Sequence, residues 1–365
     1  MRGLVQLLGR QDWRESDDAE RIAAVLDAAV ADPSPVVRMI AAQALPVLGP
    51  GQDGPERVRR AGALLISEQD ANVTAVLLNV LNSYAQTLPT DADAALRHYA
   101  SARPDVLAAP SGTEVQEALT DLLTYLAVVH RTTYASETVG DWCTLPLESP
   151  HALQTVKHLR NYFQDGRPKV AEAAFSLAAK AAQAARQRWA TLQLACSSGT
   201  PNANDERALR AGVQFAYELI WCIFSASGAD ADEARLAGKG CDPHDQKLEE
   251  FASRAVPVLL DCAVFGHAGL VDEVARTLIW LAPLNERRAL TALAGAIRPE
   301  APDLGAIHAG DDVMAYLRRL LADDRHLVLQ DREGLDAFRS LLATFAAAGH
   351  EPALSLAYDF ADVFR

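Results

Sequence analysis

The chain has 365 residues, of which half are hydrophobic and 6% are aromatic. This size suits one elongated repeat array or two compact domains, and the low aromatic content favours packed helices over a β-sandwich. The 48 acidic and 34 basic residues give a net charge of -14. That balance disfavours a protein that grips duplex nucleic acid, because such binding depends on neutralising phosphates.

Helical periodicity, in which apolar residues recur every three or four positions, runs along nearly the whole chain. In chain order it predicts helices over 17–32, 35–48, 54–69, 72–86, 91–102, 111–134, 151–164, 167–196, 206–226, 244–265, 268–281, 284–297, 310–322, 332–348 and 351–363. No segment alternates apolar and polar residues between hairpin turns. The sequence therefore predicts an all-α fold of about sixteen helices.

Three stretches interrupt this periodicity, and the last of them is the predicted long loop SGADADEARLAGKGCDP at 227–243. The first, SETVGDWCTLPLESP at 136–150, is predicted to be a loop insertion. It divides an N-terminal helical block, 1–135, from a C-terminal block, 151–365, which we expect to be continuous with the first. The second, SSGTPNAND at 197–205, is predicted to be a loop that carries a helix-capping signal for the helix after it.

The cysteines and the apolar segments bear on the cellular location of the chain. The five cysteines are odd in number, widely spaced and without a CxxC pair, which is typical of reduced thiols in a cytoplasmic protein. The longest apolar stretch, AGVQFAYELIWCIFSAS, contains Gln214 and Glu218, so it reads as a buried helix. We therefore expect a cytoplasmic protein without a membrane span.

A short pattern recurs between predicted helices. Asp32 precedes Val37 by five residues in DPSPVVRMIAAQALPVL, and Val73 lies 36 residues beyond Val37 in a similar setting. A third copy has Asp165 five residues before Val170. An acid favours the positive end of a helix, and a proline suits its first turn. One such helix pair cannot bury its apolar face alone, so copies are expected to stack.

The first copy resembles HEAT repeats. The residues that match the family's pattern are Asp32, Pro33, Val37, Arg38, Ala41, Ala42, Ala44 and Leu45. The resemblance is specific over about 16–85, extends to 149–197 and is only architectural beyond. It implies a HEAT-like α-solenoid of stacked antiparallel helix pairs, in which Asp32 and Arg38 belong to a ladder of side chains that joins neighbouring repeats. Thr74 and Ala171 stand in place of the arginine in the later copies.

The C-terminal stretch LLATFAAAGHEPALSLAYDFADVFR looks like the closing helices of helical-repeat tails in large bacterial nucleotide-binding proteins. This resemblance implies a recognition tail of a nucleotide-dependent switch or defence system. The chain contains no GxxxxGK[ST] phosphate loop of its own. HEAT-like DNA-repair enzymes share the expected architecture, which leaves a DNA-binding or repair enzyme as another alternative.

The strongest candidate binding surface is a basic stretch at 157–188. It holds two acidic and seven basic residues, the latter being Lys157, Arg160, Arg167, Lys169, Lys180, Arg186 and Arg188. At 100° per residue, one face of the helix carries Lys169, Glu172, Ser176, Lys180, Gln183 and Gln187, and the opposite face is apolar. The resemblance would place this helix on a concave surface. The hypothesis is a groove for an anion or a protein partner, and the alternative is an ordinary solvated helix face.

Trp142 is a second candidate. With Cys143, Leu145 and Leu147 it could form an exposed apolar docking element in the predicted loop, or the loop could fold back onto the helices beneath it.

No pattern supports a catalytic, cofactor or metal site. Cys241 and His244 supply one thiol and one imidazole, whereas a structural zinc site needs four ligands. No serine or cysteine stands in a nucleophile motif. We therefore expect a non-catalytic scaffold or sensor that binds a protein partner and neither nucleic acid nor a membrane.

Overall fold

The computed structural model describes residues 17–47, 54–104, 113–197, 202–230, 240–298 and 308–360. Over these residues the chain forms seventeen α-helices, four short 3-10 or π segments and no strand. The predicted all-α class is confirmed. The chain divides into two units at Trp142 and Cys143, and each is described by itself.

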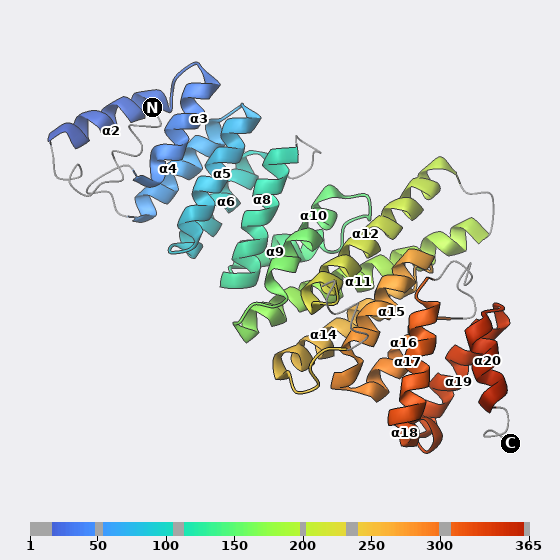
Figure 1. Ribbon diagram of the computed structural model, residues 1–365. Coiled ribbons are helices and arrows are strands. Elements are labelled where there is room, and N and C mark those ends of the chain that lie inside the picture. The colour runs from blue at the N-terminus through green and yellow to red at the C-terminus, as the bar shows by residue number, and fades with distance from the viewer. Residues whose placement is uncertain are drawn as a thin grey trace. The chain divides into compact units, whose positions relative to one another are not determined.

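The N-terminal unit arranges its helices in two layers (Figure 1). In chain order its elements are α2 (Asp17–Ala29), α3 (Pro35–Ala44), η2 (Leu45–Val47), α4 (Gly54–Ser67), α5 (Ala71–Ala85), α6 (Pro89–Ala102), α8 (Thr113–Tyr125), the π segment η3 (Leu126–His130) and α9 (Thr133–Trp142). Helices α3, α5 and α8 pack side by side in one layer, and α4, α6 and α9 form the other. Successive helices alternate between the layers, which is the packing order of stacked helical hairpins.

The C-terminal unit repeats this alternation. Its elements are α10 (Pro150–Leu159), η4 (Arg160–Tyr162), α11 (Pro168–Ser197), α12 (Ala203–Ser227), α14 (Gln246–Ala263), α15 (Ala268–Leu281), η5 (Ala282–Leu284), α16 (Glu286–Ala296), α17 (Gly310–Asp323), α18 (Arg325–Leu329), α19 (Arg332–Ala347) and α20 (Glu351–Phe360). Helices α10, α12, α15, α17 and α20 form one layer, and α11, α14, α16 and α19 the other. The short α18 packs on α17 and α19 and was not predicted.

The three predicted copies of the repeat share one turn geometry. The carboxylates of Asp32, Glu68 and Asp165 each accept a hydrogen bond at 2.8 Å from the backbone N–H two residues ahead. In every copy this turn leads into the next helix, namely α3, α5 or α11. Glu68 therefore occupies the place in the second copy that Asp32 holds in the first. A carboxylate here satisfies a backbone donor that the following helix leaves unpaired.

The predicted loop at 136–150 is wrong for its first half. Residues 133–142 form α9, and only 143–149 lie between helices. The predicted single helix over 111–134 is likewise interrupted, because a π turn follows α8 and Arg131 adopts a left-handed backbone conformation with φ 56°. Such a residue ends a helix, and it is usually a glycine, so an arginine gave no signal of the break.

The variant Arg131→Gly is expected to have a free energy of unfolding up to about 1 kcal/mol higher than Arg131→Ala, because both lose the arginine side chain and only alanine keeps the backbone cost. A left-handed conformation costs a non-glycine residue about 1–2 kcal/mol, which the greater freedom of glycine in the unfolded chain partly offsets. Urea unfolding of the two variants checks this expectation. The control is the same pair of substitutions at the exposed Glu137, inside α9, where glycine should be less stable than alanine. Equal stability of Arg131→Gly and Arg131→Ala would contradict it.

Candidate functional site

The long helix α11 presents the face that its periodicity predicts. All six residues of the predicted polar face are exposed: Lys169, Glu172, Ser176, Lys180, Gln183 and Gln187. On the opposite face Val170, Ala174, Ala178, Ala181 and Ala185 are buried, and only Leu177 is partly exposed. The apolar side packs on α10, α12 and α14. The helix thus offers a continuous polar surface from Lys169 to Gln187.

Several of the predicted basic residues are matched by acidic residues from neighbouring helices. Arg186 lies 2.7 Å from Asp261 of α14, and Lys157 lies 3.7 Å from Glu218 of α12. These acids lie outside 157–188 in the sequence, so the charge excess counted there is not the charge of the folded surface. The folded site is therefore closer to neutral than the sequence suggests.

Two further arginines of the set are engaged close to the start of α11. Arg167 pairs with Asp165 at 2.8 Å, and this guanidinium holds the pKa of Asp165 below its usual value. Arg160 donates to the hydroxyl of Ser225 at 2.6 Å. The first pair belongs to the turn that opens α11, so it orders the helix start.

Trp142 does not provide an exposed docking element. It ends α9 in the N-terminal unit, and only 5% of its surface is accessible. The expectation that it is exposed rested on a loop over 136–150, but residues 136–142 belong to α9, whose apolar side is buried. The other predicted residues all lie in the C-terminal unit.

A groove of about 390 Å³ opens near the end of α11. It is lined by Pro146, Leu147, Glu148, Gln187, Arg188, Thr191, Leu192 and Ala208. Leu147 is buried, and a Cβ added at Gly212 would lie 3.1 Å from its side chain and from the ring of Trp189. The glycine thus lets the 143–149 segment approach α12 closely and form one wall of the groove.

Arg188 is the one residue of the predicted basic set that lines this groove. Its Nη2 donates to the carbonyl oxygen of Thr144, whereas its Nη1 is buried and has no hydrogen-bond partner among the described residues. Burial lowers the pKa of Arg188, and the negative charge of Glu148 partly opposes this effect. The guanidinium is therefore incompletely satisfied.

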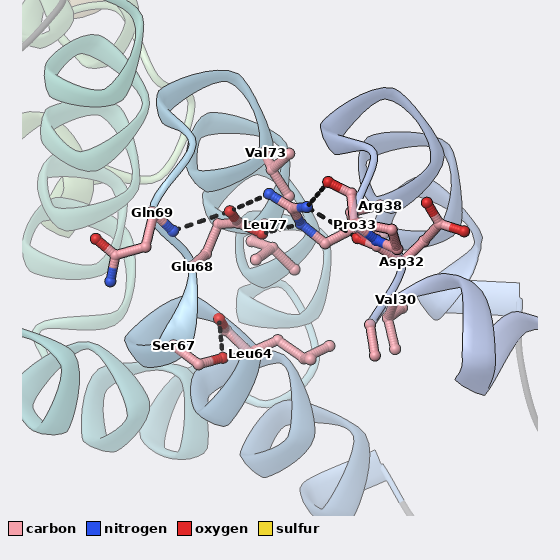
Figure 2. A pocket seen from close by; sticks show the side chains of 12 residues that line it. Val30, Asp32, Pro33, Arg38, Leu64, Ser67, Glu68, Gln69, Val73 and Leu77 are labelled. Atoms are coloured by element: carbon pink, nitrogen blue, oxygen red, sulfur yellow. Dashed lines mark hydrogen bonds and ion pairs between the residues drawn. The ribbon is translucent and has the colours of Figure 1, made fainter.

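A second pocket, of about 380 Å³, lies between the first two hairpins (Figure 2). Aliphatic side chains from α4 and α5 line one part of it, and the α2–α3 turn lines another. Figure 2 shows the guanidinium of Arg38 reaching from α3 to Glu68 at the end of α4. The two nitrogen–oxygen distances are 2.8 and 2.9 Å, so the pair is bidentate.

Arg38 and Glu68 join consecutive hairpins, and the hydrogen-bonding groups of both side chains are occupied. Arg38 also donates to the backbone carbonyls of Asp32 and Pro33, and Glu68 accepts from the N–H groups of Gln69 and Asp70. The hydrogen bond with Arg38 lowers the pKa of Glu68, although burial of the carboxyl opposes this. Because Glu68 holds in the second copy the place of Asp32 in the first, Arg38 pairs with the equivalent carboxylate of the next copy, while the Asp32 carboxylate accepts a hydrogen bond from the N–H of Ser34 in its own turn. The polar residues of this pocket therefore hold the first two hairpins together.

The structure gives roles to two buried aspartates that sequence reasoning missed. Asp93 of α6 accepts hydrogen bonds from the Thr132 hydroxyl at 2.8 Å and from the N–H groups of Tyr134 and Ala135 at 3.1 and 2.9 Å. Asp272 of α15 accepts from the N–H groups of His308 and Ala309 at 3.2 and 2.9 Å. Each aspartate therefore caps the next helix of its own layer. In the sequence, the only sign of this role was that each aspartate stands on the side of its helix that packs against other helices.

Most of the cysteine thiols are buried away from solvent. All five cysteines are free, and four of them are buried: Cys143, Cys222, Cys241 and Cys262. Burial raises the pKa of Cys143 and of Cys222 to about 12, and that of Cys241 to about 11. Thiolates are the reactive form, so these cysteines lack the environment of a nucleophile.

Alkylation of the native protein with iodoacetamide at pH 8 is expected to label Cys196 at least tenfold faster than the other four cysteines. Cys196 is partly exposed near the end of α11, whereas the others are buried thiols of raised pKa. Mass spectrometry of tryptic peptides over a time course gives the rates. Denaturation in urea is the control, since all five sites should then react alike. Comparable rates in the folded protein would contradict the expectation.

Cys241 and His244, the thiol and imidazole closest to a metal pattern in the sequence, do not belong to a cluster of metal ligands in the described residues. Cys241 is buried and His244 is exposed, and the described part of the chain holds no group of three or more His, Cys, Asp and Glu residues able to hold a metal ion. Among the helices that the structure describes, none is long and apolar enough to cross a membrane.

Comparison with known proteins provides no relative from which to assign a function. No family model matches the chain, and no curated protein matches it. A solved structure of an engineered protein from the Northeast Structural Genomics Consortium aligns with 95% of this chain and 89% of its own length at 16% identity. Its TM-score is 0.22, too low to support an argument about fold or function.

Proposed function

We propose that this protein is a non-catalytic helical-repeat scaffold of the HEAT kind that binds a protein partner through the exposed face of α11. The observation that carries the proposal is this face itself, a 30-residue helix with six exposed polar side chains in register. Stacked helical hairpins hold such faces rigidly, so a partner can bind without an ordering cost in the scaffold.

The distribution of charge favours protein over nucleic acid as the partner. Three of the basic residues at 157–188 lie in ion pairs with Asp165, Glu218 and Asp261. Binding to duplex DNA draws its affinity from basic groups that replace counterions at phosphates, and groups already paired with carboxylates contribute less. The polar and nearly neutral face of α11 suits the rim of a protein interface better.

The roles of the acidic residues also fit a scaffold. Glu68, Asp93 and Asp272 are buried, and each uses its oxygens to tie one helix to another or to cap a helix. These carboxylates stabilise the stack of hairpins, which is the part that a scaffold needs to be rigid.

Affinity purification from the source organism, followed by mass spectrometry, tests the proposal. The bait is the full chain, and nuclease treatment before elution removes bridging nucleic acid. The supporting result is a protein that survives nuclease, is retained by Lys247→Glu and is lost with Lys180→Glu. The two substitutions reverse the same charge at exposed sites, the first on α14 and the second on the α11 face. Recovery of nucleic acid in place of protein would overturn it.

A further inference from the structure

The groove at the end of α11 combines an apolar wall with an unsatisfied guanidinium. Pro146, Leu147, Leu192 and Ala208 supply aliphatic surface, and Arg188 supplies the only positive charge among the lining residues. A ligand that fills this groove gains from apolar burial and meets one cationic group.

The hydrogen bonds of Arg188 define what that ligand should carry. A guanidinium presents donors in a planar fork that matches the two oxygens of a carboxylate. Here Nη2 is held by the Thr144 carbonyl and Nη1 is buried without a partner in the described structure, so the fork is only half used. Because Nη1 has no accessible surface, a carboxylate reaches it only after the side chain shifts toward the groove; such a shift gives Nη1 an acceptor and gives up the bond from Nη2 to Thr144.

Among the described contacts, Arg188 forms no ion pair with a neighbouring acid, so its positive charge is available to a ligand. Arg186, two residues before Arg188, is matched by Asp261 and does not compete for the groove. Glu148 lines the groove and is exposed, and its charge acts on Arg188 without a direct ion pair between them among the described contacts. Glu148 is therefore a weak competitor for the guanidinium, and its removal should favour an acidic ligand.

We propose that this groove binds a segment of the partner protein in which an Asp or Glu side chain adjoins a leucine-like side chain. The carboxylate pairs with Arg188, and the aliphatic group packs against Leu147 and Leu192. The inference rests on the proposed function, because it names the chemistry by which a protein partner is recognised.

Blocked peptides test the inference on the full chain. The probes are acetyl-Gly-Leu-Glu-Leu-Gly-amide and the same peptide with Gln in place of Glu, titrated at millimolar concentration with saturation-transfer NMR. We expect the Glu peptide to bind about tenfold tighter, the gain of a charge-assisted hydrogen bond. Equal binding of the two peptides, or no binding of either, would overturn the proposal.

Three variants assign the preference to this groove. Arg188→Met should abolish the preference for Glu, Arg186→Met should retain it, and Glu148→Gln should increase it two- to threefold. Circular dichroism confirms that each variant folds. Persistence of the preference in Arg188→Met, its loss in Arg186→Met, or weaker binding by Glu148→Gln would count against the groove.

One further peptide tests whether the groove recognises a side-chain carboxylate or the carboxylate of a chain end. Acetyl-Gly-Leu-Gln-Leu-Gly with a free terminal acid should bind no better than the Gln amide, and tighter binding would overturn the choice of a side-chain carboxylate. The inference and the proposed function fail separately. If a partner protein is captured and its binding depends on Lys180, but the peptides show no preference for Glu, only the inference about the groove is wrong. If nucleic acid is recovered in place of protein, the proposed function is wrong.

Discussion

Replacing Asp93 with alanine is expected to lower the free energy of unfolding of the N-terminal unit by about 3 kcal/mol. Asp93 is only 8% exposed and accepts three hydrogen bonds, two of them from backbone N–H groups at the start of α9. Alanine leaves the N–H groups of Tyr134 and Ala135 without their acceptors in the interior. An unsatisfied buried donor costs more than an ordinary hydrogen bond contributes, because water does not replace the lost partner.

Hydrogen exchange resolves the effect at the site. The amides of Tyr134 and Ala135 should lose their protection in the alanine variant before the rest of the unit does. Asp93→Asn keeps one acceptor oxygen and should cost about half as much. Asp91→Ala, two residues earlier on α6, is the matched control and should change stability by less than about 1 kcal/mol. If Asp91→Ala and Asp93→Ala lowered the free energy of unfolding equally, the proposed capping role of Asp93 would be wrong.

Replacing Glu68 with alanine is expected to lower the free energy of unfolding by about 2 kcal/mol at pH 7. The substitution removes the bidentate partner of Arg38, which is itself on the neighbouring hairpin, and the acceptor for the N–H groups of Gln69 and Asp70. Urea unfolding measures the loss. Glu117→Ala, at an exposed position of α8 in the same unit, is the control and should be nearly neutral.

The stabilisation from Glu68 should depend on pH in a defined direction. Its folded pKa lies below the ordinary value, mainly because Arg38 donates to the carboxylate. The contribution is therefore fully present above the pKa of the unfolded chain, about 4.3, and is lost as the pH falls through the folded value. Wild type and Glu68→Ala should differ less at pH 3 than at pH 7. A difference that stays constant over this range would contradict the ionic origin.

The helices and the face of α11 were predictable from sequence because their causes are local. Apolar residues every three or four positions determine which side of a helix is buried, and this rule placed all six exposed residues of α11 correctly. Asn202 caps α12 through the N–H groups of Asn204 and Asp205, as the polar run before that helix predicted. The spacing of the three copies was also visible in the sequence, whereas the carboxylate-to-backbone bond that they share, and the place of Glu68 in it, came from the structure.

The break at Arg131 and the charge of the α11 face needed the tertiary structure. Arginine carries no turn signal, and α9 starts where it does because Asp93, about 40 residues earlier, supplies its cap. Asp261 lies 75 residues beyond Arg186 and Glu68 lies 30 beyond Arg38, so counting charges along the chain gives neither pair.

The sequence alone therefore determined that this protein is built of amphipathic helices, where most of them begin and end, and which faces they bury. Only the tertiary structure decided which charges cancel, which carboxylates cap a distant helix and where a guanidinium is left half satisfied beside an apolar groove. The physical reason is that periodicity acts within one helix. Pairing of charges acts between helices that stack one hairpin apart, at sequence separations set by loop and helix lengths.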